Sequence, residues 1–241
     1  MIDIKKRIIP QGRRNRPMTN PASSLYRKTM RPVYITIHNT GNRSASATAA
    51  NHAIYLTGVT AANVPVSWHF TVDDLEVWQH LPLDESGWHA GDNLGPGNTT
   101  TIGIEICENH LPDNMNKYLE AENNAAWLCA QLIKDSNSLR PFPECMKQHF
   151  DWSGKNCPSV IRGRSNGWNV FLSKIEGHLK QPKPPAELPE VQRTIAVEID
   201  GKMTDIQGYL INNSTYVHAA PLVRALGYEI SGHGDHVKVR K

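Results

Sequence analysis

The chain has 241 residues, of which 39% are hydrophobic and 20% are charged, and its formal net charge at pH 7 is +3. This composition is typical of a folded globular protein and excludes a disordered chain. No stretch approaches the ~20 consecutive apolar residues of a membrane span, and the N-terminus lacks the apolar centre of a secretory signal. The sequence therefore predicts synthesis in the cytoplasm without membrane insertion.

The N-terminal segment is basic, with nine Lys or Arg among the first 31 residues. Such a segment can either bind an anionic polymer or simply be exposed to solvent. The interleaved aromatic residues and recognition helix typical of nucleic-acid binding are missing, so nucleic acid is not predicted as a partner.

Residues 181–190 read QPKPPAELPE, with four prolines in ten positions. Proline density of this kind favours an extended spacer. We therefore expect a domain over residues 1–180, a linker over 181–190, and a small domain over 191–241.

The first domain alternates predicted strands and helices. Strands are expected over 33–38, 66–72, 76–81 and 101–107, and helices over 44–56, 118–133 and 168–179. In the strand 33–38, His38 lies on the face opposite the apolar residues, and in 101–107, Glu105 lies opposite three isoleucines. The predicted fold class is α/β, with a mixed central sheet flanked by helices.

The tail predicts a small α+β domain. Residues 194–208 suggest a hairpin that turns at Asp200 and Gly201, 221–226 fit a helix, and 228–240 return to strands. His233 and His236 flank a Gly-Asp pair, which is best interpreted as a polar turn.

The four cysteines, Cys107, Cys129, Cys145 and Cys157, do not suggest a disulfide framework, because they are far apart in a long chain. Cys107 and Cys129 fall in apolar segments and are expected to be buried. Cys157 differs, since it follows His149 by eight residues across a loop that contains glycine. Imidazole and thiolate are good zinc ligands, and His38 at the end of its strand is the natural third candidate. Spacing alone leaves open that the three residues are unrelated.

Five sequence blocks occur in a familiar order: YITIHNTGN (34–42), SWHFTVDD (67–74), WHAGD (88–92), TTIGIEICEN (100–109) and HFDWSGKNCPS (149–159). Over about residues 10–179 the chain resembles the type 2 N-acetylmuramoyl-L-alanine amidases. These include bacterial autolysins, phage endolysins and, more distantly, peptidoglycan recognition proteins. The resemblance implies an amidase/peptidoglycan recognition protein-like fold and cleavage of peptidoglycan between N-acetylmuramic acid and L-alanine.

The resemblance also implies roles for individual residues. His38, His149 and Cys157 are the expected zinc ligands. Glu105 is the expected acid/base, against the alternative of a salt-bridged strand carboxylate. Lys155 is the expected stabiliser of the oxyanion, against the alternative of a solvated loop cation.

This chain departs from some relatives at Trp68, where they carry a tyrosine that takes part in proton transfer. Indole has no acid/base function near neutral pH, so Glu105 would carry more of the proton traffic. Trp68, His69 and His89 are expected to lie near the substrate groove. Ordinary packing or buried hydrogen bonding is the alternative for each, and Trp88 and Trp152 leave the same choice open.

The segment from residue 197 to 230 is similar to the small domain found at the N-terminus of copper amine oxidases and attached to Gram-positive wall proteins. It implies attachment to the wall, for example through secondary wall polymers, or pairing with another copy, but no copper chemistry.

Two other functions fit the sequence less well. A peptidoglycan-binding protein without catalysis would be expected to lack the cysteine ligand, and Cys157 is present. A zinc peptidase would bring a motif such as HExxH, which does not occur. A wall substrate without a secretion signal suggests a phage endolysin, released through a membrane pore or by lysis, or an autolysin of prophage origin.

Overall fold

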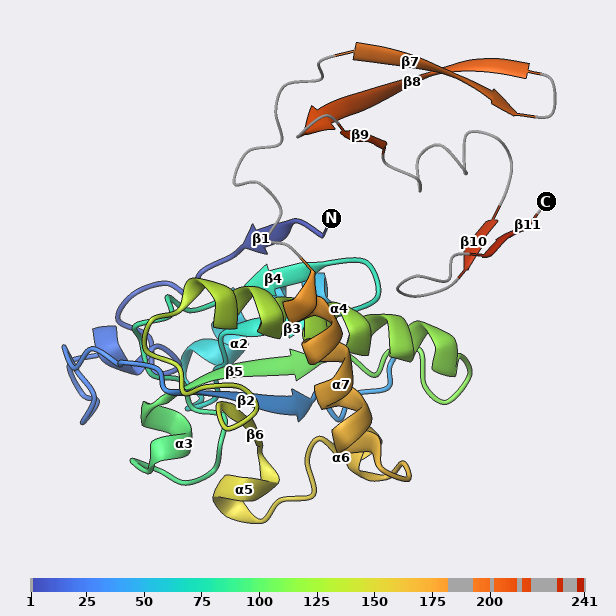
Figure 1. Cartoon of the computed structure of the whole chain (residues 1–241). Helices are drawn as coiled ribbons and strands as arrows, with labels where there is room; N and C mark the ends of the chain where they lie inside the picture. Colours follow the sequence, from blue (N-terminus) through green and yellow to red (C-terminus); the bar gives the residue numbers. More distant parts are fainter. Residues whose placement is uncertain are drawn as a thin grey trace. The chain divides into compact units, whose positions relative to one another are not determined.

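The computed structural model describes residues 2–181 and five strands beyond them, at 193–199, 202–211, 214–217, 229–231 and 238–240. The chain divides into two compact units, Met1–Gln181 and Pro182–Lys241 (Figure 1). None of the helices in the described residues is long and apolar enough to cross a membrane.

The first unit is built on a mixed six-stranded sheet within residues 2–181. Its strands lie in the order β1 (Ile4–Lys6), β4 (Val77–Gln79), β3 (Phe70–Val72), β5 (Thr101–Ile106), β2 (Tyr34–Asn39) and β6 (Met146–Gln148). Strands β3 and β4 pair antiparallel, and the other neighbours run parallel. The predicted mixed α/β sheet is confirmed. The short strands β1 and β6 were not predicted, and β3 is shorter than the expected 66–72.

Helices connect and cover these strands. They are α1 (Ala49–Thr57), α2 (Val59–Ala62), α3 (Pro96–Thr99), α4 (Met115–Asp135), α5 (Phe150–Ser153), α6 (Ser159–Arg162) and α7 (Gly167–Lys180), with a 3₁₀ turn at Pro17–Thr19. Helix α1 begins later than the predicted 44–56. The hydroxyl of Thr48 accepts the Asn51 N–H at 3.2 Å, and this cap fixes where the helix starts.

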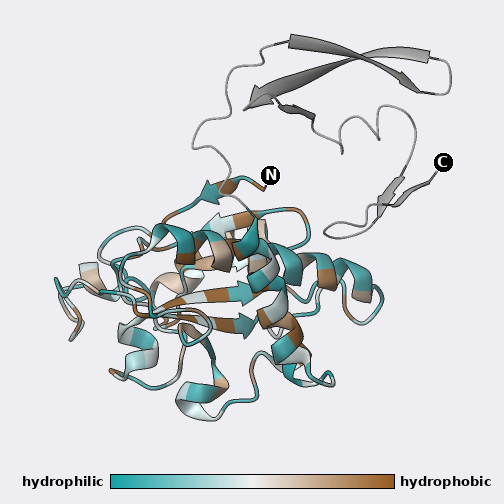
Figure 2. Ribbon diagram, viewed as in Figure 1, coloured by the Kyte–Doolittle hydropathy of each residue, from teal (hydrophilic) through white to brown (hydrophobic). Residues whose placement is uncertain are grey.

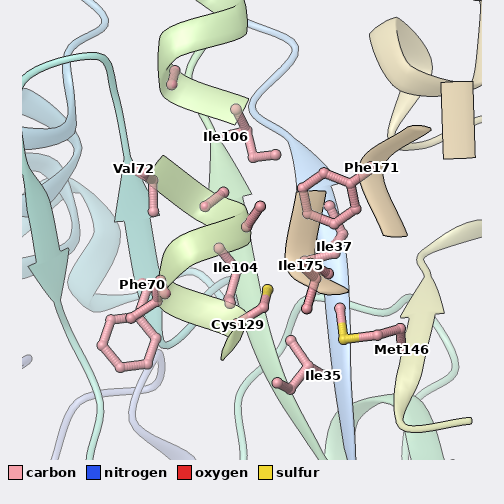
Figure 3. Packing of buried hydrophobic residues seen from close by; sticks show 14 of the residues in the cluster. Ile35, Ile37, Phe70, Val72, Ile104, Ile106, Cys129, Met146, Phe171 and Ile175 are labelled. Carbon is pink, nitrogen blue, oxygen red and sulfur yellow. The ribbon is translucent and has the colours of Figure 1, made fainter. Parts of the chain in front are cut away.

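The main core lies between the sheet and the helices α4 and α7 (Figure 3). The isoleucines of β2 and β5 all point into it, as the alternation predicts: Ile35, Ile37, Ile102, Ile104 and Ile106, each at most 2% exposed. Cys129 from α4 and Phe171 from α7 pack onto them. Figure 2 shows hydrophobic residues on the central strands and hydrophilic ones on outward helix surfaces. Because one sheet face is filled in this way, polar residues of the same strands must occupy the other.

All four cysteines are buried and free of disulfides. This confirms the expectation for Cys107 and Cys129, which are 1% and 0% exposed.

A buried carboxylate joins α4 to α7. Glu122 is fully buried, and its two oxygens bind Arg164 and, at 2.7 Å, Lys174. Replacing Glu122 with glutamine leaves both cations without their counter-charge. Since these cations remain 26% and 25% exposed, we expect a loss of about 3 kcal/mol, at the lower end of the usual range for a broken buried pair.

That loss corresponds to a fall in melting temperature of about 6–12 °C for a unit of this size. Glu120→Gln, on the exposed side of the same helix, is the matched control and should melt like the wild type. Equal melting temperatures for the Glu122 and Glu120 variants would show that the triad does not hold α4 to α7.

The second unit contains two groups of strands. Strand β7 (Arg193–Ile199) pairs antiparallel with β8 (Lys202–Ile211), which pairs with β9 (Ser214–Val217), while β10 (Glu229–Ser231) pairs with β11 (Lys238–Arg240). The predicted hairpin strands are present. The turn at Asp200 and Gly201, the helix at 221–226 and His233 with His236 lie outside the described residues.

Candidate metal centre

The candidate ligands come from three places that the sheet brings together. His38 lies near the end of β2, His149 follows the neighbouring strand β6, and Cys157 lies in the loop between α5 and α6. The His149 N–H donates to the Ile37 carbonyl at 3.2 Å, which continues the β2–β6 pairing up to the ligand. Parallel strands thus deliver two imidazoles to one edge of the sheet.

The three donor groups converge closely. Nδ1 of His38 lies 3.0 Å from Nδ1 of His149 and 3.9 Å from Sγ of Cys157. One ligand atom from each residue falls within 4.8 Å of the others, and all three residues are buried. The sequence prediction of a His-His-Cys cluster therefore agrees with the geometry of the described residues.

This donor set fits zinc. Burial is the main cause that lowers the pKa of His38 well below its usual value and that of His149 to about 4, so both rings are neutral and offer lone pairs. Burial raises the pKa of the Cys157 thiol to about 12. A buried thiol of this kind becomes a thiolate when a cation binds beside it. Two imidazoles and one thiolate are borderline-soft ligands, and three protein ligands are typical of catalytic zinc.

Asn39 holds the Cys157 loop in place, a role that the sequence did not reveal. Its backbone N–H donates to Sγ of Cys157 at 3.4 Å. Its side chain donates to the Tyr118 hydroxyl at 2.9 Å and accepts the Val160 N–H at 3.0 Å. The residue after one ligand therefore ties the strand to the loop that carries another. The only available signal was its place in the YITIHNTGN block.

Glu105 lies beside the ligands on β5, paired in register with His38. Its Oε1 is 4.0 Å from Nδ1 of His38, and Oε2 is buried without a hydrogen bond among the described residues. Burial raises the pKa of Glu105 to about 8, while the positive charge of Lys155 acts in the opposite direction. A carboxylate that titrates near neutral pH and faces an ion site can take up and release a proton there.

A cavity of about 580 Å³ opens onto this cluster. Glu105, His149 and His89 line it, and the exposed Lys155 contributes to the same wall. Its other lining residues are Pro65, Val66, Trp68, Trp88, Gly91, Asn93, Asn98 and Ser153. The predicted catalytic residues therefore share one solvent-accessible space with a candidate ligand.

The tryptophans separate into two groups. Trp68 and Trp88 line the cavity, and the Trp68 N–H donates to the Thr71 hydroxyl at 2.7 Å. Trp152 instead donates to the Thr36 hydroxyl at 2.9 Å and packs edge-on against Tyr34. It does not line this cavity, so the packing alternative holds for Trp152.

Of the two histidines expected near the groove, only His89 lines the cavity. His69 is fully buried, and both ring nitrogens bind backbone groups: Nδ1 accepts the Gly103 N–H at 3.0 Å and Nε2 faces the Glu85 carbonyl at 2.8 Å. His69 does not line the cavity, and its arrangement fits the alternative of a buried, hydrogen-bonded histidine. His89 does line the cavity, and its Nδ1 lies 3.0 Å from Nε2 of His38.

Comparison with known proteins supports the same family. The sequence profile described as N-acetylmuramoyl-L-alanine amidase (Amidase_2) matches residues 28–160, more than half of the chain. The chain belongs to this family. All of the candidate ligands and Glu105 fall within the matched region.

Individual amidase relatives match a longer part of this chain than the family profile does. The amidase CwlH of Bacillus subtilis (strain 168) is 44% identical over 184 residues, covering 76% of this chain and 65% of CwlH. The solved catalytic domain of XlyA has a TM-score of 0.60 at 42% identity, with 72% of this chain and 99% of that domain covered. A mutant endolysin from Bacillus subtilis has a TM-score of 0.61 at 42% identity, with 73% and 99% covered. The chain thus spans less than two thirds of CwlH but nearly all of these solved structures.

Proposed function

We propose that this chain is a zinc-dependent N-acetylmuramoyl-L-alanine amidase. It hydrolyses the amide bond between N-acetylmuramic acid and the first L-alanine of the peptidoglycan stem peptide. The observation that carries the proposal is the convergence of His38, His149 and Cys157 beside Glu105, at one cavity, in a member of the amidase family. When bound by these ligands, zinc supplies a Lewis acid that polarises a carbonyl and makes water acidic enough to ionise near pH 7.

Glu105 is proposed to handle the protons. In the reaction its carboxylate takes the proton of the attacking water and passes it to the departing amine of L-alanine, which is a poor leaving group without it. The cavity gives substrate access to this carboxylate, which lies beside the three ligands that would hold the zinc. Trp68 supplies no proton, and its indole N–H is already bound to Thr71.

Lys155 is proposed to stabilise the negative charge that develops on the carbonyl oxygen. It lies two residues before Cys157 and lines the same cavity as Glu105. Its ammonium group also opposes the rise in the pKa of Glu105, so its field reaches the reacting centre. A positive charge positioned where an oxyanion grows lowers the barrier of acyl transfer.

Metal removal tests the zinc requirement. Dialysis of the full chain against a strong chelator should abolish lysis of purified cell walls, and one equivalent of zinc should restore it. Binding of about one zinc per chain, measured by elemental analysis, should accompany recovery. Full lysis by protein shown to be metal-free would refute the zinc-dependent mechanism.

The cellular role follows as a further part of this proposal. The likeness to a solved endolysin supports production in the cytoplasm and action on the wall after release through a pore or by lysis. Residues 191–241 would act as a wall-binding or association module after the linker at 181–190, with secondary wall polymers as the ligand class.

A truncation tests the two-domain proposal. The catalytic residues and their core all lie within the compact unit that ends at Gln181. Residues 1–180 should therefore fold, bind zinc and cleave soluble muropeptides at the wild-type rate, but bind intact walls less tightly. A truncated protein that is unfolded or inactive on soluble muropeptides would contradict the assignment of domains.

A further inference from the structure

The two ring nitrogens of His38 face different partners. Nδ1 faces the other ligands, at 3.0 Å from His149 and 3.9 Å from Cys157. Nε2 faces away from them and lies 3.0 Å from Nδ1 of His89, with the two rings edge to face at 90°. We propose that His89 is the positioning residue of the metal centre: it accepts the Nε2 proton of His38 and so fixes the nitrogen that His38 presents to zinc. This inference rests on the proposed zinc site.

The direction of this hydrogen bond follows from the chemistry of a ligand. A metal-bound imidazole nitrogen offers a lone pair and carries no proton, so neutral His38 must hold its proton on the opposite nitrogen. That proton points at Nδ1 of His89, which must then be an acceptor. The proton of His89 then lies on its Nε2, which is buried and has no hydrogen-bond partner among the described residues. In these tautomers Nδ1 of His38 is free to bind the metal, and Nε2 of His38 donates to His89.

The backbone holds His89 independently of its ring. The Asn98 side-chain oxygen accepts the N–H groups of both His89 and Ala90 at 2.8 Å. The Asp92 carboxylate in turn accepts the N–H groups of Gly97 and Asn98, at 2.6 and 3.1 Å. Substitution of the His89 side chain therefore leaves the segment anchored.

The sheet leaves room for the ring only because residue 103 is glycine. A Cβ atom on Gly103 would lie 2.9 Å from three ring atoms of His89, closer than side chains normally approach. The backbone of Gly103 is also held in place, since its N–H donates to Nδ1 of His69 at 3.0 Å. His69 thus helps to hold the part of the strand against which the His89 ring packs, although it is not one of the proposed zinc ligands.

Burial makes the hydrogen bond consequential. His38 is 1% exposed and His89 is 8% exposed, so solvent offers no ready substitute for the acceptor. Without it, His38 either keeps an unpaired buried N–H or moves its proton to Nδ1. If the proton moves to Nδ1, that nitrogen no longer has the lone pair that binds zinc. Loss of the acceptor should therefore weaken zinc binding even if the fold is intact.

A matched pair of amides tests this directly. In His89→Asn the side-chain oxygen is attached to Cγ, close to where Nδ1 stands, whereas in His89→Gln it lies one bond further out. Zinc affinity is measured by competition with a chromophoric chelator, without substrate. We expect His89→Gln to bind zinc about 10- to 100-fold more weakly than wild type, the usual cost of losing such a partner. His89→Asn should recover most of this loss.

A third variant removes hydrogen bonding but keeps ring volume. His89→Phe should lose zinc affinity to the same extent as His89→Gln, and the melting temperature of each zinc-free variant reports on its fold. Wild-type affinity in both would overturn the proposal. So would equal weakening of the Asn and Gln variants, because the position of the acceptor would not matter. Failure of wild-type protein to cleave peptidoglycan would count against the proposed function and leave this zinc measurement interpretable.

Discussion

We expect Glu105→Gln to lower kcat for peptidoglycan hydrolysis by about 10²- to 10⁴-fold, the range usual for loss of a general acid/base. Zinc content should stay at wild-type level, because the substitution removes no ligand. Stability should also be kept, since Oε2 makes no hydrogen bond among the described residues. The measurements are kcat on soluble muropeptides, zinc content and melting temperature on one preparation.

Glu120→Gln is a suitable control, because it also removes one carboxylate but on the exposed part of α4. It should be indistinguishable from wild type in all three measurements. A structural role for Glu105 predicts the reverse pattern, with a large fall in melting temperature and normal turnover in the folded fraction. Wild-type kcat in stable, zinc-loaded Glu105→Gln would remove Glu105 from the mechanism.

Cys157→Ser is expected to have a comparable or larger effect, through the metal. A hydroxyl is a much poorer zinc ligand than a thiolate, so the variant should no longer hold zinc through dialysis. Wall lysis should fall by more than the 10- to 100-fold typical of losing a partner that only supports a ligand. Added zinc should raise the melting temperature of wild type but not of Cys157→Ser, because binding to the folded state stabilises it.

The matched control is Cys107→Ala. Cys107 is equally buried, but its thiol lies 3.9 Å from His52, outside the ligand cluster. This variant should bind one zinc and lyse walls normally. Stoichiometric zinc in Cys157→Ser, or its loss in Cys107→Ala, would show that the ligand set is wrong.

The sequence revealed those parts of the structure that depend on local periodicity. Apolar and polar residues alternate in 33–38 and 101–107, which predicted that His38 and Glu105 lie on the strand faces opposite the isoleucines. In the structure the isoleucines are buried, and His38 pairs in register with Glu105. The ligand cluster needed more than periodicity. Eleven histidines offer many combinations, and the ordered family blocks selected two of them.

Tertiary contacts explain what could not be predicted. The strands β1 and β6 have three residues each and pair only with neighbours distant in sequence, so they leave no periodic signal. The different roles of His69 and His89 depend on which atoms face each ring. Both stand in quoted blocks, yet backbone groups take both nitrogens of His69, while His38 takes Nδ1 of His89.

Identifying the bond that is cut tests the proposed amidase activity. Purified peptidoglycan is digested with the zinc-loaded full chain, and with Glu105→Gln as control, and the fragments are analysed by mass spectrometry. We expect stem peptides with a free L-alanine amino terminus, together with glycan strands whose muramic acid carries a free lactyl carboxyl group, and almost none of either product with the variant. Cleavage between sugars or within the stem peptide by the wild-type protein would contradict the proposed activity.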